Sequence, residues 1–372
     1  MKFKFLVFLL LIPQLGFSYY LCRPCCSRLQ LPGWWGSADY LLLWRKARFY
    51  PLLVTTNPTL IPTLDAPGTT VLFGNENIHG SPKSGGRGDI GFWLTRCLGF
   101  GGGAFAVGEE NKSFDLKGDS AGLPIFGRPF FNTNAGVEDV DLLSFPALQL
   151  NGSVDISTHN RIWGLDLYAR YRFFRTPCFK FDLLAGFEFN KIIDNLEINS
   201  LTTSALLETE AVMDHFGCEN LFYGGLAGLT AEWRSKNWAI RVLGKVGIGN
   251  MHKEIDIFGS SSSITLGGPA IFNDFGLLAQ PSNSGHFTIN KFEVIPQINA
   301  NIQLRVWGHM WLSAGYTFMY WHSLALAGEQ VDLNINPTQV PGPPIGLVSP
   351  IFSDAETSYW IQGFTAGIYV CY

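Results

Sequence analysis

A long stretch of strict alternation between apolar and polar residues constrains the fold of this chain most strongly. In residues 291–307, every second residue from Phe292 to Val306 is apolar, and almost all the residues between them are polar or charged. Successive side chains of a β-strand point to opposite faces, so this segment is predicted to be a strand with one apolar face. It exceeds the roughly 5–6 residues of common soluble strands and suffices for a tilted membrane-spanning strand, which needs about 9–11.

The same alternation recurs along the chain and predicts ten strands. They are expected near residues 34–45, 86–95, 98–107, 161–174, 179–190, 221–234, 237–249, 291–307, 310–322 and 358–372. Short connections near 96–97, 175–178, 235–236 and 308–309 alternate with long ones near 46–85, 108–160, 191–220, 250–290 and 323–357. Outer-membrane barrels alternate short periplasmic turns with long outer loops in this way. The prediction is an all-β fold: an antiparallel transmembrane β-barrel of about ten strands, within a range of 8–12 because 108–160 could hold two more.

The composition favours a barrel in lipid over a soluble domain. Charged residues make up 15% and aromatic residues 14% of the chain, whereas about 25% of residues are charged in ordinary soluble domains. The net charge of −4 excludes a strongly basic nucleic-acid-binding protein. All eleven tryptophans lie near ends of the predicted strands, which indicates two aromatic girdles at the membrane interfaces. The last predicted strand alternates from Phe364 to Tyr372 and ends on an aromatic residue, as bacterial outer-membrane proteins do.

The N-terminus is typical of a secretory signal peptide over residues 1–18. Lys2 and Lys4 precede an apolar stretch at 5–12, and Gly16 and Ser18 supply the small residues of a cleavage site. The apolar stretch is far shorter than the roughly 20 residues of a spanning helix. We therefore expect a cysteine-containing segment at 19–33, a barrel at 34–372 and a location in the bacterial outer membrane.

Several short strings follow one another from residue 34 onward. They include Trp34-Trp35, Tyr40-Leu41-Leu42, Pro51-Leu52-Leu53-Val54-Thr55-Thr56, Gly85-Gly86-Arg87-Gly88-Asp89-Ile90-Gly91-Phe92-Trp93-Leu94, Arg128-Pro129-Phe130-Phe131-Asn132, Asn220-Leu221-Phe222-Tyr223-Gly224-Gly225, Gly244-Lys245-Val246-Gly247-Ile248-Gly249-Asn250, Leu277-Leu278-Ala279-Gln280-Pro281-Ser282-Asn283 and Asn336-Pro337-Thr338. In order and spacing they resemble the outer-membrane β-barrel porin family found in planctomycetes and related bacteria. That resemblance implies fold and location more strongly than transport.

The cysteines depart from that family pattern. The chain has 7, an odd count, so at least one is free or pairs with another chain. In the predicted topology the disulfide candidates, all at the periplasmic side, are Cys22, Cys25, Cys26, Cys97, Cys178 and Cys371. We hypothesise that some form disulfides with other envelope proteins. A metal site at Cys22–Cys26 is not expected, because no second ligand pair has suitable spacing.

Charged residues on the polar face of the strands are expected to line the barrel lumen. The lumen-lining candidates are Asp39, Arg45, Arg87, Asp89, Asp166, Arg170, Arg172, Lys180, Asp182, Glu188, Arg241, Lys245, Glu293 and Arg305. They could line an aqueous path for passive diffusion of small solutes. Alternatively they could form internal salt bridges in a barrel too narrow to conduct, which anchors the envelope or presents its loops for binding.

Other sequence features give weaker evidence about function. The acidic run with Asp194, Glu197 and Asp214 in the expected loop 191–220 is either solvated or binds divalent cations, and His252, Glu254 and Asp256 alternate as cation ligands could. The chain has no G-x-S-x-G motif and no Ser/His/Asp set that spacing can unite, so an enzyme is not expected. No cofactor is expected either. The expected partners are outer-membrane lipid, envelope proteins and, for a pore, small solutes, with no nucleic acid.

Overall fold

A computed structural model describes residues 33–372 except 79, 206–207 and 341–343. The expected signal peptide, with Cys22, Cys25 and Cys26 of the following segment, lies outside the described residues. In the described part of the chain, no helix is long and apolar enough to cross a membrane.

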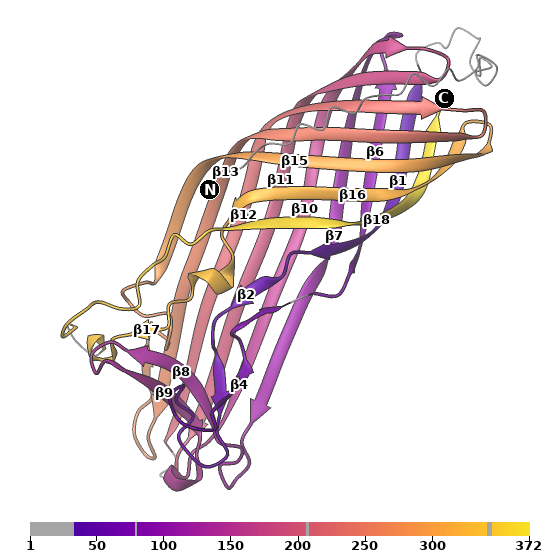
Figure 1. Ribbon diagram of the computed structural model, residues 1–372. Coiled ribbons are helices and arrows are strands. Elements are labelled where there is room, and N and C mark those ends of the chain that lie inside the picture. The colour runs from indigo at the N-terminus through magenta and orange to yellow at the C-terminus, as the bar shows by residue number, and fades with distance from the viewer. Residues whose placement is uncertain (1–32, 79, 206–207, 341–343) are drawn as a thin grey trace, which may run out of the picture.

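Ten antiparallel strands close into a barrel (Figure 1). They are β1 (Trp34–Arg45), β6 (Lys83–Trp93), β7 (Leu98–Lys117), β10 (Asn151–Arg175), β11 (Phe179–Thr203), β12 (Thr209–Arg234), β13 (Trp238–Ile264), β15 (Gly285–Trp307), β16 (Met310–Leu324) and β18 (Thr357–Cys371). Each pairs with its neighbour in this order, and β1 pairs with β18 from Trp35↔Cys371 to Arg45↔Ile361. Closure leaves no unpaired sheet edge in lipid. The predicted all-β barrel of ten strands is confirmed.

Five strands run much further than the sequence pattern predicts. β7 has 20 residues, and β10 to β13 have 25, 25, 26 and 27. The predicted long loop at 191–220 is wrong over most of its length, because this segment continues β11 and β12. The predicted loops at 108–160 and 250–290 are wrong at both ends, where β7, β10, β13 and β15 continue. The connection between β11 and β12 is only residues 204–208. The twelve-stranded alternative is also wrong, since β8 (Phe126–Asn132) and β9 (Val137–Ser144) pair with each other in a separate sheet.

The strand extensions reverse the orientation of the apolar face. In β11, Phe187 and Phe189 point outward and Glu188 inward, whereas further along the strand Asn195 points outward and Leu196 is fully buried inside. We call the part with an apolar outer face the membrane band. We call residues 46–82, 109–160, 191–220, 250–290 and 325–356 the dome. The short turns mark the periplasmic end, so the dome is extracellular.

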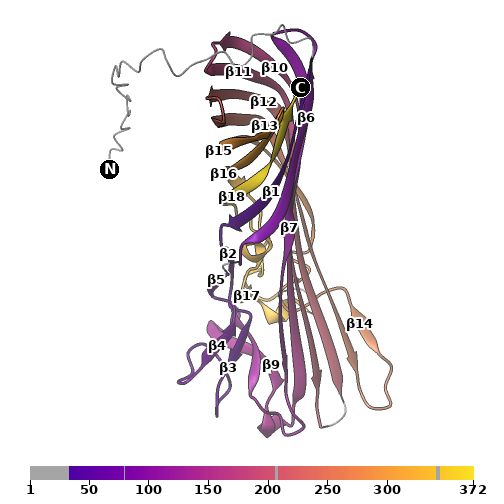
Figure 2. The same ribbon diagram turned by 90° about the vertical axis from the view of Figure 1, so that its right-hand side faces the viewer.

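Connections cover one face of the extended strands in the dome. A second sheet contains β3 (Val54–Thr56), β4 (Thr70–Phe73), β8, β9 and β17 (Asn334–Ile335), and β2 (Arg48–Tyr50) pairs with β5 (Glu76–Ile78). Figure 2 shows β3, β4 and β9 on one side of the long strands and β14 (Ile271–Asn273) on the other. Three short 3-10 helices lie in the connections, at Pro146–Leu148 (η1), Ala327–Gln330 (η2) and Pro337–Gln339 (η3).

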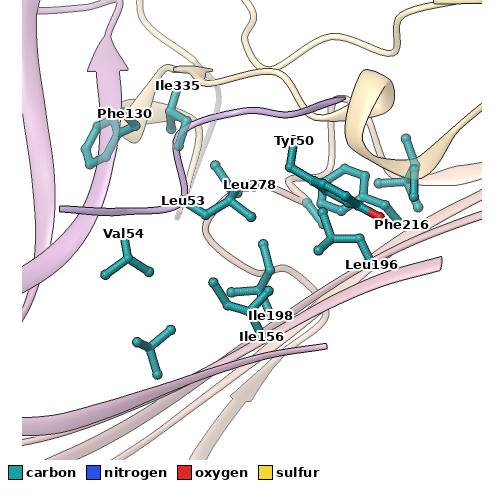
Figure 3. Packing of buried hydrophobic residues seen from close by; sticks show 14 of the residues in the cluster. Tyr50, Leu53, Val54, Phe130, Ile156, Leu196, Ile198, Phe216, Leu278 and Ile335 are labelled. Atoms are coloured by element: carbon teal, nitrogen blue, oxygen red, sulfur yellow. The ribbon is translucent and has the colours of Figure 1, made fainter. Parts of the chain in front are cut away.

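A hydrophobic core holds the dome connections to the strands (Figure 3). Ile156, Ile198 and Phe216 project from the strand extensions, and Tyr50 and Leu278 come from two connections. All five are at most 2% exposed. Full burial of each such side chain contributes about 1.5–3 kcal/mol, so the dome packs as a soluble domain does.

Candidate functional site: the barrel lumen

The sequence-derived charged candidates occupy three levels of the inner face. The central level has Asp39, Arg87, Asp89, Asp166, Glu188 and Lys245; the periplasmic level has Arg170, Arg172, Lys180, Asp182 and Arg305; the dome side has Arg45 and Glu293. Arg241 lies between the first two levels and lines the same central space as Asp89 and Asp166. Strand alternation sets these positions, because every second residue of each strand points inward.

Ion pairs at the central level join neighbouring strands as well as strands on opposite sides of the lumen. Arg87 of β6 lies 3.0 Å from Asp39 of β1, and it also donates to Asn299 of β15. Lys245 of β13 lies 2.7 Å from Asp166 of β10. Arg87 and Lys245 thus each have a carboxylate partner, as partly buried charges require.

Asp89 has aromatic partners instead of a cation. The Trp35 indole N–H donates to one carboxylate oxygen at 2.9 Å, and the Tyr168 hydroxyl donates to the other at 2.5 Å. Hydrogen bonds to both oxygens satisfy a carboxylate that has left bulk water.

Amide and hydroxyl side chains complete this level and were not among the sequence-derived candidates. Gln297 and Asn190 donate to Glu188, and Thr317 donates to Asn299. Gln297 and Asn299 lie on the predicted polar face of residues 291–307, which was a usable signal for these two. The remaining central cavity measures about 90 Å³, enough for a handful of water molecules.

An apolar layer separates this cavity from the dome. We call it the lumen plug, and it consists of Leu41, Leu43, Phe105, Val107, Ile162, Ile192, Phe222, Met251, Ile295, Met319, Trp321, Leu324, Leu326, Tyr359 and Ile361. All are buried, and Trp321, Tyr359 and Ile361 are 0% exposed. The layer therefore packs side chain against side chain across the lumen.

A second buried cluster lies between the cavity and the periplasm. It consists of Trp35, Tyr168, Leu184, Leu226, Ala239, Trp311 and Tyr369. Trp35 and Trp311 therefore pack inside the barrel, as does Trp321 in the lumen plug. Trp93 packs against the same cluster, with its ring centroid 5.1 Å from that of Trp35. The expectation that every tryptophan belongs to a lipid girdle was wrong for these four, because ten strands leave an interior that large side chains can fill.

Above the plug, a buried ionic network ties the dome to the barrel. Asp194 of β11 lies 2.5 Å from Arg48 of β2 and accepts hydrogen bonds from Asn160 at 3.1 Å and from the backbone of Ala327 at 2.9 Å. Asp194 therefore joins strands β10 and β11 to connections 46–82 and 325–356. Sequence reasoning placed Asp194 in a loop and missed this role, although the alternation of Ile192, Asp194 and Leu196 was a usable signal.

Asp214 of β12 likewise ties connections to the wall, further out in the dome. It lies 2.5 Å from Arg128 of β8 and accepts from the backbone N–H groups of Leu278 and Ala279 at 2.9 and 2.7 Å. The expectation of a solvated or cation-binding acidic loop was therefore wrong for Asp194 and Asp214, which are fully buried and paired.

Glu356, just before β18, fixes another connection to the wall. Lys253 lies 2.5 Å and Lys291 2.8 Å from its carboxylate. Burial raises the pKa of Glu356, but hydrogen bonds from Lys253, Lys291 and Ser323 outweigh that effect and hold the pKa at about 2.

His252, Glu254 and Asp256 lie on the outer face of the β13 extension. His252 contacts Glu254 at 3.0 Å, and Asp256 pairs instead with His286 at 2.6 Å. Among the described residues, no group of three His, Cys, Asp or Glu side chains is arranged to hold a metal ion.

The disulfide candidates inside the described residues gather at the periplasmic end. Cys97 is exposed in the turn between β6 and β7, and Cys371 ends β18. Cys178 is buried just before β11. Within the described part of the chain, Cys97, Cys218 and Cys371 are free thiols.

Comparison with solved structures finds other outer-membrane barrels at low identity. The outer membrane protease OmpT from Escherichia coli is 9% identical, with a TM-score of 0.43, 93% of this chain covered and 100% of that one. A Pseudomonas aeruginosa FadL homologue is 6% identical, with a TM-score of 0.23 and coverage of 92% and 90%. The toluene transporter TodX from P. putida is 9% identical, with a TM-score of 0.22 and coverage of 92% and 90%. These likenesses carry no argument about activity.

The family assignment rests on a match over almost the whole barrel. No curated protein matches the chain. The model of one family matches residues 35–372, which confirms the resemblance to β-barrel porins and the location in the bacterial outer membrane. The chain therefore belongs to the family described as "Putative beta barrel porin-7 (BBP7)".

Proposed function

We propose that this protein is a non-conducting outer-membrane barrel that anchors its dome at the cell surface. The lumen plug is the observation that carries the proposal, since buried apolar side chains fill the lumen on the dome side of a small polar cavity. Ions and polar solutes lose hydration in such a layer and find no replacement partners. The family's description as a porin supports a non-enzymatic role.

Passive diffusion of small solutes is the second candidate. The porin description and the inward charges at the central level favour it. The mutual pairing of those charges favours a packed network, because Arg87 and Lys245 each have a carboxylate within 3.0 Å.

Conductance distinguishes the two functions. The mature protein would be refolded, checked by heat-modifiable gel mobility and inserted into a planar lipid bilayer beside an open porin as positive control. We expect no unitary current steps from the wild type. A Met319→Ala/Trp321→Ala variant, which removes two plug side chains of β16, is expected to leak ions.

The matched control is Phe318→Ala/Tyr320→Ala, which shortens the two outward-facing neighbours on the same strand. This control should stay silent. Stable current steps from the folded wild type would overturn the anchoring proposal and establish passive diffusion.

Disulfide links to other envelope proteins are a further part of this proposal. Cys97 is the best placed of the described candidates because it is exposed in a periplasmic turn. Non-reducing gels of native envelopes should show a high-mass band that Cys97→Ser weakens. Monomer alone in those gels would contradict the link.

A further inference from the structure

Cationic side chains accumulate at the periplasmic end of the barrel. We define this end as residues 93–98, 170–182, 232–241, 303–311 and 369–372. It contains nine lysines and arginines and only two carboxylate side chains. The cations are Arg96, Arg170, Arg172, Arg175, Lys180, Arg234, Lys236, Arg241 and Arg305, and the carboxylates are Asp182 and Glu232.

The opposite end has the reverse balance. The dome contains 23 aspartates and glutamates against 7 lysines and arginines. The net charge of −4 therefore hides a strong separation between an acidic outer end and a cationic periplasmic end.

The two periplasmic carboxylates are already shared among four cations. Asp182 pairs with Arg170 at 2.6 Å and Arg172 at 3.0 Å. Glu232 pairs with Arg234 at 2.7 Å and Lys180 at 3.3 Å. Within the described residues, the other five cations of this end have no carboxylate within 4.0 Å; they are Arg96, Arg175, Lys236, Arg241 and Arg305.

Aromatic rings hold several of the guanidinium groups in place. The Arg172 guanidinium carbon lies 4.0 Å from the centre of the Trp93 ring, that of Arg241 lies 5.1 Å from the Tyr369 ring, and that of Arg305 lies 5.9 Å from the Trp311 ring. Stacking uses the face of a guanidinium, while its N–H groups donate in the plane. Such groups are pre-ordered donors for carboxylates.

We propose that the periplasmic end binds an acidic peptide segment. Seven of the nine cations are arginines, whose planar fork matches a carboxylate bidentately. A peptide with several carboxylates would meet several cations that the chain itself leaves without partners. Bilayer headgroups fit less well, because Arg172, Arg241 and Arg305 belong to the inner face of the wall, away from lipid. This proposal holds whether or not the lumen conducts.

The test measures binding of a fluorescein-labelled hexaglutamate peptide to the full-length mature barrel in zwitterionic detergent, by fluorescence anisotropy. We expect saturable binding at low ionic strength that weakens as salt is added, since screening acts on exposed charges. An uncharged hexaglutamine peptide of equal length should not bind.

The informative variant is Arg175→Glu/Lys236→Glu, which reverses two exposed turn charges without breaking an ion pair between described residues. The matched control is Lys112→Glu/Lys117→Glu, which makes the same charge change at exposed dome positions. We expect the turn variant to lower the affinity about tenfold or more, while the dome variant leaves it nearly unchanged, because complementary charges act locally. Heat-modifiable mobility confirms that both variants fold.

Three results would overturn the proposal. One is absence of hexaglutamate binding at low salt, and another is equal loss in the turn and dome variants. The third uses vesicles of phosphatidylglycerol compared with phosphatidylcholine. If the turn variant loses affinity only for the anionic vesicles and keeps it for hexaglutamate, the cations serve a lipid surface instead.

Discussion

The membrane band and the dome are built from the same strands with opposite faces. In the band of β13, Ile248 points outward and Lys245 inward, whereas in its dome extension His252 points outward and Ile255 is buried inside. Backbone pairing continues without interruption across the boundary. The surroundings of each face, lipid or water, therefore decide which side chains it carries.

The two regions also differ in what fills the inside. The band encloses ion pairs and amide hydrogen bonds around a small cavity, closed off by apolar layers. The dome encloses a hydrophobic core crossed by buried ion pairs such as Arg48–Asp194 and Arg128–Asp214. Lateral stability of the band comes from its closed hydrogen-bonded wall, while the dome depends on its core and these buried ion pairs.

The sharpest test of this difference is to remove an ion pair at the junction. Asp194→Ala leaves the buried Arg48 guanidinium with only the Glu110 carboxylate, 3.6 Å away, and breaking a buried pair costs up to about 3–5 kcal/mol. We expect connections 46–82 and 325–356 to exchange amide hydrogens faster and to be cut by protease, while the barrel keeps its heat-modifiable mobility.

The control for this variant is Glu197→Ala, three positions along β11 on the outer face, where the carboxylate accepts from Asn199. It should leave exchange in both connections unchanged. Loss of the barrel itself in Asp194→Ala would show that band and dome are one stability unit.

An arginine on the outer face should destabilise the membrane band more than the dome, by a smaller free energy than the loss of the buried ion pair. Leu167 of β10 is 67% exposed in the membrane band, and an arginine facing lipid there costs about 2–4 kcal/mol near the midplane. Ser157→Arg places the same residue on the outer face of the same strand in the dome, opposite Glu197. We expect Leu167→Arg to lower the free energy of unfolding in lipid vesicles and Ser157→Arg to change it little. Equal effects would mean that the membrane band of β10 extends past residue 160 as far as Ser157.

The sequence predicted the band well and the dome poorly, for a physical reason. All ten spanning strands were expected close to their positions, because apolar outer and polar inner residues alternate there. In the dome the alternation persists with its polarity reversed, and charged residues such as Glu197 and Asp214 looked like a solvated loop. The sequence also could not predict whether side chains close the lumen, since closure depends on how residues such as Trp321 and Tyr359 pack across strands.

The pairing of carboxylates could not be predicted for a related reason. Asp194 and Asp214 meet arginines that lie 146 and 86 residues away in the chain. Period-two alternation fixes which face a residue takes and gives no information on which distant connection will cover it.

The smallest expected effect concerns Asp141, a carboxylate whose charged form destabilises the folded dome. Burial raises the pKa of Asp141 in β9 from 3.8 to about 6, against the lowering effect of Arg128. The folded dome then binds a proton that the unfolded chain has released, so its stability falls as the pH rises from 3.8 to about 6. Asp141→Asn removes this charge and should stabilise β8 and β9 by about 1–2 kcal/mol at pH 8, with little change at pH 4. Hydrogen exchange of the β8 and β9 amides measures the difference, with the exposed Asp274→Asn as control. An equal gain at both pH values would mean that the amide stabilises the dome through packing or hydrogen bonding, and that the Asp141 charge is not the cause.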